Sequence, residues 1–567
     1  MSDRPVLEVD VACVGFGPAT GGFLTTLSRS GLSPSVICYE RADDIAFGVS
    51  GAVTRARGIR ASFPDLNPAE IPMAAPVAHE KLLYLLDPVG ASRRPATMRI
   101  ADHAPRSLGL AHYAAIELPY TPPFLRKDDG LLLSIGQFNQ WVGNQLMNSG
   151  AVQIWPATPV AAPLIEGTRV TGVQLADMDV RAALTVVGDG PVGAVGRQID
   201  AHFGLPDGHR NQEWAVGMKM VVELPAHADL EPGTVWHTFG YPEPEIFGFL
   251  YVHPEKLASV GIFIPSWFRN PVRTSYRYLQ HFIQHPYLWR YLEGGTLRSW
   301  GAKSLAESGR RGEPYLAGDG WARIGEGSGS TNVLTGSGVD EAWTTGTQLG
   351  EAVIELLKAG RPFTRENLEQ TYIRRRRESW VEEESLIAAR ARDGFHRGVP
   401  SGLFGMALAG ITKGRFTVHG APKTLPSVEE YYGGRIPAEE VRRIRSECAA
   451  KGASVHDALM ERAGWPPIPY DGGLLVSHQD ALLLGGKVQA APGYPDHVHF
   501  ADPARCARCE ARTCVEMCSG EAITQGSDGV PAFDREKCIH CGACLWNCPE
   551  GVLQFEAGAG GLHSAQN

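Results

Sequence analysis

The sequence predicts an α/β protein with an inserted antiparallel sheet and a small cysteine-rich α+β domain at its C-terminal end. Three observations lead to this prediction: glycine turns that each follow a β-rich run and open a helical stretch, an alternating apolar pattern between two of those turns, and eight of the eleven cysteines gathered between Cys506 and Cys548. With 567 residues, 43% of them hydrophobic and 20% charged, the chain is long enough for three or four globular domains. We divide it into four regions. The first is discontinuous and combines residues 1–215 with 310–360, and the other three are residues 216–309, 361–468 and 469–567.

The first glycine turn follows a β-rich run over residues 9–14 and precedes a helical stretch that ends near Leu27. Gly15 and Gly17 permit a tight turn and let the backbone approach a pyrophosphate, whose charge the helix N-terminus stabilises. Thr20 stands where a third glycine is usual, and Gly21 follows one residue later. The pattern predicts a dinucleotide site.

A second strand, over residues 35–39, supports this site about 20 residues further on. It ends at Glu40, which is placed to accept the adenosine ribose hydroxyls, and Arg41 beside it is a further candidate for cofactor binding.

The second glycine pattern contains Gly188, Asp189 and Gly190, after the strand-like run 184–187 and before a helical stretch over 195–203. A separate NAD(P)H site is one interpretation. However, polar residues rather than a strand precede Glu213, the acid at the expected distance. The segment instead looks like the Asp-Gly segment of the hydroxylase-type flavoprotein fold. In that fold this segment contacts the same FAD as the first glycine turn.

The third pattern combines a strand at Trp321, an acid, a glycine loop and a helical stretch over 341–357. Such a loop can place Glu326 on the flavin's ribityl hydroxyls while the helix N-terminus faces the phosphates or the isoalloxazine. A glycine-rich surface loop is the alternative. The candidate residues are Gly325, Glu326, Gly329, Gly336 and Gly338.

Alternating apolar segments lie between the second and third patterns, at residues 218–224, 247–252 and 260–264. A period of two predicts strands of an antiparallel sheet. We expect this sheet to cover the flavin on its substrate side.

The eight clustered cysteines form two runs, and the second has the bacterial ferredoxin spacing with a proline after its last cysteine. In such pairs the fourth cysteine of each run ligates the other cluster. We therefore assign one 4Fe-4S cluster to Cys506, Cys509, Cys514 and Cys548, and the other to Cys538, Cys541, Cys544 and Cys518. Two structural zinc sites with four cysteine ligands are the alternative. The remaining Cys13, Cys38 and Cys448 are expected to be small buried residues.

Composition excludes several classes of function. The net charge of −9 leaves no electrostatic footprint for nucleic-acid binding. No run of eighteen apolar residues exists, which argues against a spanning helix but not against a helix lying in the membrane interface.

Several motifs together resemble the electron-transfer flavoprotein:quinone oxidoreductase family, from Val9 to about Leu357 and again from Pro469 onward. The matching segments are Phe47-Gly48-Val49-Ser50-Gly51-Ala52, Phe249-Leu250-Tyr251, His285-Pro286, Leu292-Glu293-Gly294-Gly295, Trp300-Gly301-Ala302 and Gly325 through Gly338. The resemblance implies a membrane-associated enzyme with FAD, an iron–sulfur domain and a quinone pocket, and it adds Ser50 and Gly51 to the candidate FAD residues. The chain departs from the family in its second set of cluster ligands, and in having Ile246 and Phe247 where the family has paired glycines.

The region 362–397 is helical and highly charged, and its arginine row, residues 374–377, predicts a solvated face. The apolar stretch 398–411 that follows suits a monotopic segment, because the basic residues around it can meet anionic head groups. These flanks are Arg390, Arg392, Arg397, Lys413 and Arg415. A buried core helix is the alternative. Residues 118–125 lie where the family has a second membrane contact, although their prolines also permit an ordinary loop.

Together these features predict an oxidoreductase on the cytoplasmic face of a membrane, bound peripherally. We expect it to pass electrons from reduced electron-transfer flavoprotein through two 4Fe-4S clusters and FAD to a quinone. No side chain stands out as a catalytic acid or base. Two alternatives stay open: a ferredoxin-coupled FAD-dependent reductase of isoprenoid double bonds, and an electron-relay subunit of a larger flavoprotein complex, bifurcating or not.

Overall fold

A mainly parallel sheet carries the three glycine turns. The computed structural model describes residues 4–45, 51–206, 213–484, 486–487, 496–556 and 562–563. Within this part of the chain eight strands form the sheet, in the order β17 (Ala317–Gly318), β18 (Trp321–Arg323), β11 (Asp179–Val187), β1 (Val6–Val14), β2 (Val36–Tyr39) and β8 (Gln153–Trp155), with β10 (Arg169–Gln174) and β9 (Ala162–Glu166) extending from β11. β1 pairs in parallel with both β11 and β2, so the first two glycine turns leave the sheet side by side.

Both faces of this sheet are covered, which explains the unbroken apolar run that ends β1. Val11 and Cys13 pack against α1 (Pro18–Ser28) and α8 (Val339–Lys358). Ala12 and Val14 face the other way, toward α5 (Ala194–Phe203). A strand buried on both faces reads as continuously hydrophobic rather than alternating. Cys13, Cys38 and Cys448 are buried, as predicted.

α1 and α8 approach closely because glycines face the partner backbone. A methyl group at Gly22 would lie 2.5 Å from the carbonyl oxygen of Trp343, and one at Gly346 would lie 1.8 Å from that of Ala19. No side chain fits at either position.

A second sheet is mainly antiparallel and contains the three predicted strands. Among the described residues its order is β16 (Thr296–Ala306), β12 (Trp214–Glu223), β15 (Leu257–Pro265), β14 (Phe247–Val252), β13 (Thr234–Phe239), β5 (His79–Leu85) and β6 (Ala115–Leu118). β14 has the predicted bounds, β15 extends beyond them at both ends, and β12 begins earlier and ends one residue sooner. On β14, Leu250 and Val252 face the helices α6 (Ser275–Ile283) and α7 (Pro286–Leu292). Phe249 and Tyr251 face the small sheet of β3 (Ala52–Thr54), β7 (Leu131–Leu133) and β4 (Ala75–Pro76).

The other elements of the first 330 residues lie around the two sheets. They are α2 (Arg57–Ser62), α3 (Ala96–Ser107) and α4 (Ile135–Ser149), with short turns η1 (Pro68–Glu70), η2 (Gly309–Gly312) and η3 (Glu326–Ser328).

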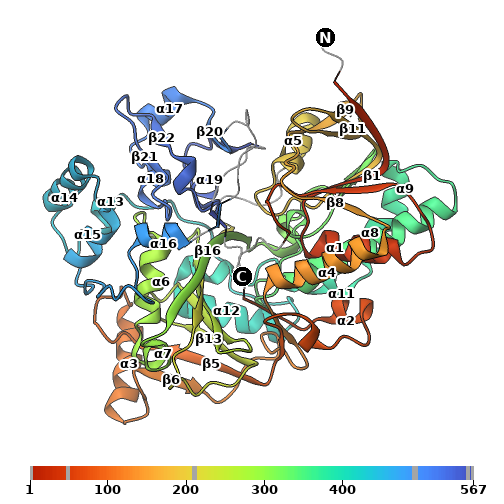
Figure 1. Cartoon of the computed structure of the whole chain (residues 1–567). Coiled ribbons are helices and arrows are strands. Elements are labelled where there is room, and N and C mark those ends of the chain that lie inside the picture. Colours follow the sequence, from red (N-terminus) through yellow and green to blue (C-terminus); the bar gives the residue numbers. More distant parts are fainter. Residues whose placement is uncertain are drawn as a thin grey trace.

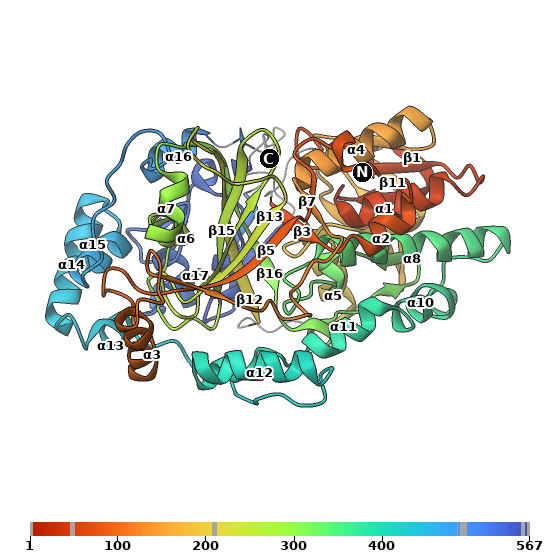
Figure 2. The ribbon, with the colours of Figure 1, turned by 90° about the horizontal axis from the view of Figure 1, so that it is seen from below.

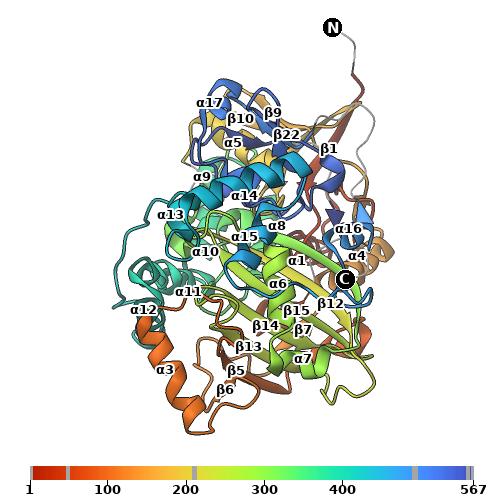
Figure 3. The same ribbon diagram turned by 90° about the vertical axis from the view of Figure 1, so that its left-hand side faces the viewer.

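A helical region follows α8, and its apolar helix lies at the periphery of the molecule (Figure 2). Its elements are α9 (Arg365–Leu368), η4 (Glu369–Ile373), α10 (Arg374–Arg377), α11 (Trp380–Ala388), η5 (Asp393–Arg397), α12 (Val399–Ile411), α13 (Val428–Tyr432), α14 (Ala438–Lys451) and α15 (Val455–Arg462). Met98 of α3 packs beside Val399 of α12, and both helices lie along the same side of the molecule (Figure 3).

The expectation of a solvated arginine row is wrong for half of its members. Arg376 is fully buried, with its guanidinium 3.7 Å from Glu313, and Arg377 pairs with both Glu313 and Glu382. A buried carboxylate needs a compensating charge, so Arg376 and Arg377 turn toward Glu313 rather than toward solvent.

The C-terminal elements are short, and the two cysteine runs each include a one-turn helix. The elements are α16 (His478–Leu484), β19 (Gly486–Lys487), β20 (Val498–Phe500), α17 (Pro503–Arg508), α18 (Thr513–Glu516), β21 (Ile523–Gln525), β22 (Pro531–Phe533), η6 (Arg535–Lys537), α19 (Ala543–Trp546), β23 (Leu553–Phe555) and β24 (Leu562–His563). In Figure 1 these elements, in blue, lie above the second sheet and beside the first.

Candidate cofactor sites and the junction between them

A cavity of about 260 Å³ opens where β1, β2 and β11 end. The first and second glycine turns both line it, together with Glu40, Arg41 and residues of α5's first turn. Ligands of open α/β sheets bind outside the carboxyl ends of the strands, so this is the expected place for a dinucleotide. Because both turns line one cavity, a single ligand there could contact both of them.

The glycines of the first turn leave room for a backbone-bound phosphate. Gly15 has a φ of +84°, and a methyl group there would lie 2.8 Å from the carbonyl oxygen of Gly188. A methyl group at Gly17 would meet no protein atom within 4 Å, so this position faces open space at the start of α1. The residues present fit a pyrophosphate.

Thr20 replaces the usual third glycine without disturbing the packing. Its side chain is fully buried, and its hydroxyl donates to the carbonyl oxygen of Gly15 at 2.7 Å. Gly188 opposite has no side chain, and a methyl group there would lie 2.5 Å from the Thr20 hydroxyl. Gly21 lies inside α1, against Trp343 and Val142.

Glu40 ties the end of β2 to the glycine turn. Its carboxylate accepts the backbone N–H of Phe16 at 2.7 Å and that of Ala42 at 2.9 Å. The side chain is therefore held at the cavity wall, where a ribose hydroxyl can reach it.

Asp189 caps α5 rather than pointing outward. Its carboxylate accepts the backbone N–H of Gly196 at 2.9 Å, and burial raises its pKa. Gly190 has a φ of +77°, and the Lys303 ammonium lies within about 4 Å of the position that a methyl group there would take.

Two lysines that the sequence analysis did not single out stand beside the third glycine segment. Lys219 of β12 donates to the carbonyl oxygen of Gly51 at 3.0 Å, and burial together with nearby Lys303 lowers its pKa to about 8. Glu326 accepts the backbone N–H of Ala306 at 3.2 Å, and burial raises its pKa against the pull of these lysines. The signal was present, because Lys219 interrupts the apolar run from Trp214 to Val222.

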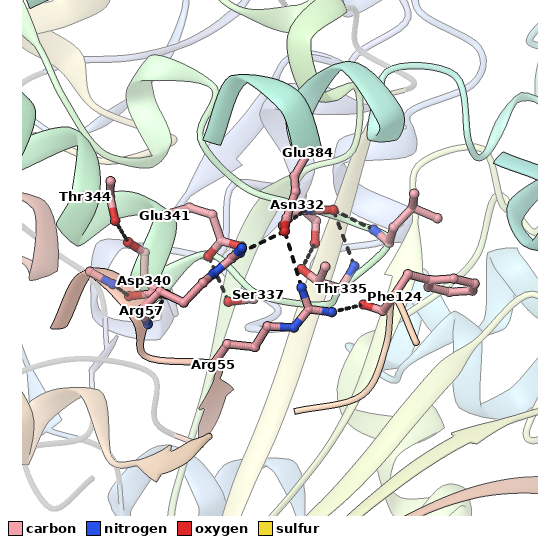
Figure 4. Close-up of polar contacts among 12 residues, drawn as sticks. Arg55, Arg57, Phe124, Asn332, Thr335, Ser337, Asp340, Glu341, Thr344 and Glu384 are labelled. Atoms are coloured by element: carbon pink, nitrogen blue, oxygen red, sulfur yellow. Dashed lines mark hydrogen bonds and ion pairs between the residues drawn. The ribbon is translucent and has the colours of Figure 1, made fainter. Parts of the chain in front are cut away.

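The third glycine segment is held from outside by a polar network (Figure 4). Glu384 of α11 accepts from Arg55, Arg57 and Asn332 at 3.2, 2.8 and 3.0 Å. This network joins the segment around Asn332 to the β3–α2 turn.

At the start of α8 two acids are buried and serve different partners. Asp340 accepts three backbone N–H groups of α2, from Arg57, Gly58 and Ile59. Figure 4 shows Asp340 beside Arg57. Glu341 accepts from the Ser337 hydroxyl at 2.8 Å, and burial, with Asp340 nearby, raises its pKa to about 7.

The other predicted glycines shape the same segment. Gly325, Gly329 and Gly336 have φ angles of +72°, +72° and +61°, and Gly338 precedes the first turn of α8. Ser50, like the matching residues Phe47 to Val49, lies outside the described residues.

The two cysteine runs exchange members in space. Cys506, Cys509, Cys514 and Cys548 line one small pocket; we call it the distal pocket. Cys518 lies among the other three: burial and then the nearby Cys518 raise the pKa of Cys541 to about 12, and Cys518 acts in the same direction on Cys538 and Cys544. We call this group, Cys518, Cys538, Cys541 and Cys544, the proximal pocket. Each pocket thus holds three cysteines of one run and one of the other. In the described part of the chain, no three His, Cys, Asp or Glu side chains are arranged to hold a single metal ion.

Two histidines contact the sulfur of Cys538 in the proximal pocket. His497 is fully buried, with Nε2 at 3.2 Å from the Cys538 sulfur, and the backbone N–H of His540 donates to the same sulfur at 3.3 Å. The His540 ring contacts the Arg41 guanidinium at 2.6 Å and lines the dinucleotide cavity. The proximal pocket therefore adjoins this cavity.

The elements from α17 to β23, which carry the eight clustered cysteines, are called the cysteine domain below. Further contacts hold this domain against the second sheet. Trp214 of β12 and Trp546 of α19 stack face to face, with ring centroids 3.8 Å apart and planes within 1°. The Ser304 hydroxyl donates to the carbonyl oxygen of Cys541. Gly542, with a φ of +79°, leaves no room for a methyl group, which would lie 2.7 Å from Val192 and from Ser304.

α12 has one buried face and one exposed face. Its buried face is built of small residues against aromatic rings: a methyl group at Gly402 would overlap Phe395, and one at Gly410 would overlap Phe124 of the 118–125 segment. Phe404 and Ile411 point outward and are 63% and 79% exposed. Among the described helices, none is both long and apolar enough to cross a membrane.

One expected basic flank of α12 points into the molecule. Arg392 forms an ion pair with Glu307, and its guanidinium lies 5.2 Å from the ring centroid of Phe247. It pairs inside because Glu307 is buried and needs a counter-charge.

Comparison with protein families matches residues 214–305 to the ETF-QO ubiquinone-binding model and residues 530–553 to a 4Fe-4S binding domain. The electron transfer flavoprotein-ubiquinone oxidoreductase of Pseudomonas aeruginosa is 24% identical over 97% of this chain and 98% of its own length. The mitochondrial protein of the same name from Arabidopsis thaliana is 24% identical over 98% of this chain and 84% of its own length.

Solved structures agree on the fold. A flavoprotein/dehydrogenase from Cytophaga hutchinsonii aligns with a TM-score of 0.50 at 15% identity, over 80% of this chain and 98% of its own. A geranylgeranyl bacteriochlorophyll reductase-like protein from Thermoplasma acidophilum aligns with a TM-score of 0.51 at 14% identity, over 76% of this chain and 100% of its own. The predicted flavoprotein fold with a C-terminal 4Fe-4S domain is confirmed, and so is the resemblance of this chain, over nearly its whole length, to the electron-transfer flavoprotein:quinone oxidoreductase family.

Proposed function

We propose that this chain is an oxidoreductase that passes electrons from a reduced electron transfer flavoprotein, through 4Fe-4S clusters and FAD, to a membrane quinone. The observation that carries the proposal is the contact between Arg41 and His540. It joins the end of the second FAD-side strand to a residue that lies between two cluster cysteines. Electrons therefore have a short protein path between the two cofactors.

Around the FAD site we assign binding roles and no catalytic acid or base. Gly15, Gly17 and the α1 N-terminus would hold the pyrophosphate, and Glu40 the ribose. Lys219 and Lys303, with Glu326, stand where the ribityl chain and flavin ring would follow. FAD supplies the exchange between one-electron and two-electron transfer.

The two pockets support a two-cluster assignment. Each has four cysteines, in the three-plus-one arrangement that exchanged fourth ligands require. We assign a 4Fe-4S cluster to each, with the proximal cluster between the distal cluster and FAD.

We further propose that the protein binds the cytoplasmic face of an anionic membrane peripherally, through α12. Phe404 and Ile411 provide an exposed apolar face, and Phe124 places the 118–125 segment beside the helix. Behind α12, Phe247 packs edge-on against Phe395 at 5.8 Å, and Trp267 stacks on the same ring at 4.9 Å. This aromatic cluster lies between the membrane-facing helix and the sheet that matches the ubiquinone-binding model, so we place quinone entry there.

The decisive experiment is anaerobic stopped-flow spectroscopy with reduced electron transfer flavoprotein. Absorbance at the flavin should show reduction by this donor and reoxidation by a long-chain quinone. A parallel assay with polyprenyl lipid separates the alternatives, because reduction of the lipid and not of the quinone would indicate an isoprenoid double-bond reductase.

Metal analysis tests the cluster assignment separately. We expect about eight iron atoms and one FAD per chain. Four iron atoms, or stoichiometric zinc, would contradict the two-cluster assignment while leaving the flavin assay unaffected.

A further inference from the structure

The surroundings of the two cysteine pockets differ in the groups that face the sulfurs. At the distal pocket, Glu550 lines the wall, and Asp502 caps α17, the helix that carries Cys506. Arg505 is already paired with Glu550 at 3.0 Å. Arg512 also lines this pocket, so arginines as well as carboxylates lie around it.

At the proximal pocket the nearest groups are donors and a cation. A thiolate can only accept a hydrogen bond, so His497, at 3.2 Å, donates through Nε2 to the Cys538 sulfur. The Arg41 guanidinium contacts the ring of His540, two residues along the chain from Cys538, and so brings a positive charge to this side of the pocket.

Backbone donors add to this difference. The Cys518 sulfur accepts the backbone N–H of Ala522 at 3.3 Å, so with the His540 N–H on Cys538 the proximal pocket has two backbone donors.

Hydrogen bonds to cluster sulfurs and nearby positive charge stabilise the reduced, more negative form of a cluster, whereas carboxylates oppose it. On the basis of the two-cluster assignment above, we propose that the two clusters are inequivalent: the proximal cluster has the higher reduction potential, and His497 and Arg41 are the side chains that raise it. Electrons then reside mainly on the proximal cluster, which is the cluster beside FAD. Because Arg41 follows the strand that ends at Glu40, the FAD half of the molecule itself tunes the cluster.

The test is a potentiometric titration of the purified holoenzyme, followed by electron paramagnetic resonance. His497→Phe keeps an aromatic ring in the pocket but removes the donor. His497→Gln keeps an N–H group that can reach the sulfur. The exposed His499, two residues further on, supplies the matched control His499→Phe.

The wild type should show two reduction steps. In His497→Phe only the higher step should move to a more negative potential, in His497→Gln it should move less, and His499→Phe should leave both steps in place. An unchanged higher step in His497→Phe, or a shift of the lower step instead, would overturn the proposal. If His497→Phe loses iron, His497→Leu, which also lacks the donor, takes its place, and an unshifted higher step there counts against the role of His497.

This result is separable from the function proposed above. A single reduction step with four irons in the wild type would refute two clusters. Two steps of which neither responds to His497 would leave the two-cluster assignment standing and refute the inference.

Discussion

The cysteine-domain junction and the α12 face bury their aromatic side chains differently. At the junction, Trp214 and Trp546 cover each other almost completely, and both are buried. On α12, Phe404 is 63% exposed although it lies in an apolar helix. The first arrangement is an internal interface that the fold already completes, and the second is a surface whose apolar area is still available to a bilayer. Similar side chains therefore have different roles at the two ends of the proposed electron path.

The largest expected effect lies at the junction. Trp546→Ala should lower the free energy of unfolding by about 3 to 5 kcal/mol, because a buried tryptophan leaves a cavity when truncated. Thermal unfolding followed by circular dichroism measures this. Phe404→Ala, on the exposed face, should change stability by less than about 0.5 kcal/mol. Equal losses in the two variants would contradict the distinction between interface and free surface.

The dinucleotide cavity is polar and should respond less than the junction. Glu40→Ala should weaken FAD retention by about 1 to 3 kcal/mol, because a charge-assisted hydrogen bond is lost. Glu326→Ala should have an effect of the same size if it holds the ribityl hydroxyls. Fluorescence of released FAD during dialysis provides the measurement. Glu8→Ala, on the exposed part of β1, is the control, and FAD affinity unchanged in both cavity variants would refute their placement.

The α12 face should affect membrane binding and not folding. Phe404→Asp should release the protein from anionic liposomes, because the buried apolar area supplies about 1.5 to 3 kcal/mol per large side chain. Leu403 is unsuitable for this test, since it packs against the buried Met98–Phe395–Val399 cluster. Liposome sedimentation at low and high salt measures both the apolar and the electrostatic contributions.

A matched control for this prediction is Leu483→Asp on α16, because Leu483 is 85% exposed but lies away from α12. Long-chain quinone reduction should fall in Phe404→Asp and stay unchanged in Leu483→Asp, while a soluble short-chain quinone is reduced by both. Retention of Phe404→Asp on liposomes at high salt would place the membrane contact elsewhere.

A buried acid beside the second sheet should make stability depend on pH. Burial raises the pKa of Glu243 to about 8, whereas an unfolded chain ionises this group near pH 4.5. Between these values the folded state binds more protons than the unfolded state, so the stability contribution is complete below about pH 4.5 and is lost as pH rises through 8. Denaturant titrations from pH 5 to 8.5 should show a weaker fall in stability for Glu243→Gln than for the wild type. The exposed Glu8→Gln should follow the wild type, and identical slopes in all three would contradict the shift.

The elements that the sequence predicted correctly depend on local rules. The glycine turn after residues 9–14, the strand that ends at Glu40 and the helix after Gly338 each follow from neighbouring residues, and all are present. The arginine row at 374–377 and the flank at Arg392 were misjudged, because a run of charges does not reveal whether a buried carboxylate lies opposite. Lys219 was overlooked for a related reason: its importance depends on which strand face meets Gly51.

By itself, the sequence determined the type of each cofactor site, because cysteine spacing and glycine turns encode ligand chemistry within a few dozen residues. Only the tertiary structure decided how the sites are joined. Arg41 and His540 stand 499 positions apart along the chain and come into contact because the cysteine domain docks across both sheets. Docking depends on the shape and charge of two finished surfaces, and no local pattern carries that information.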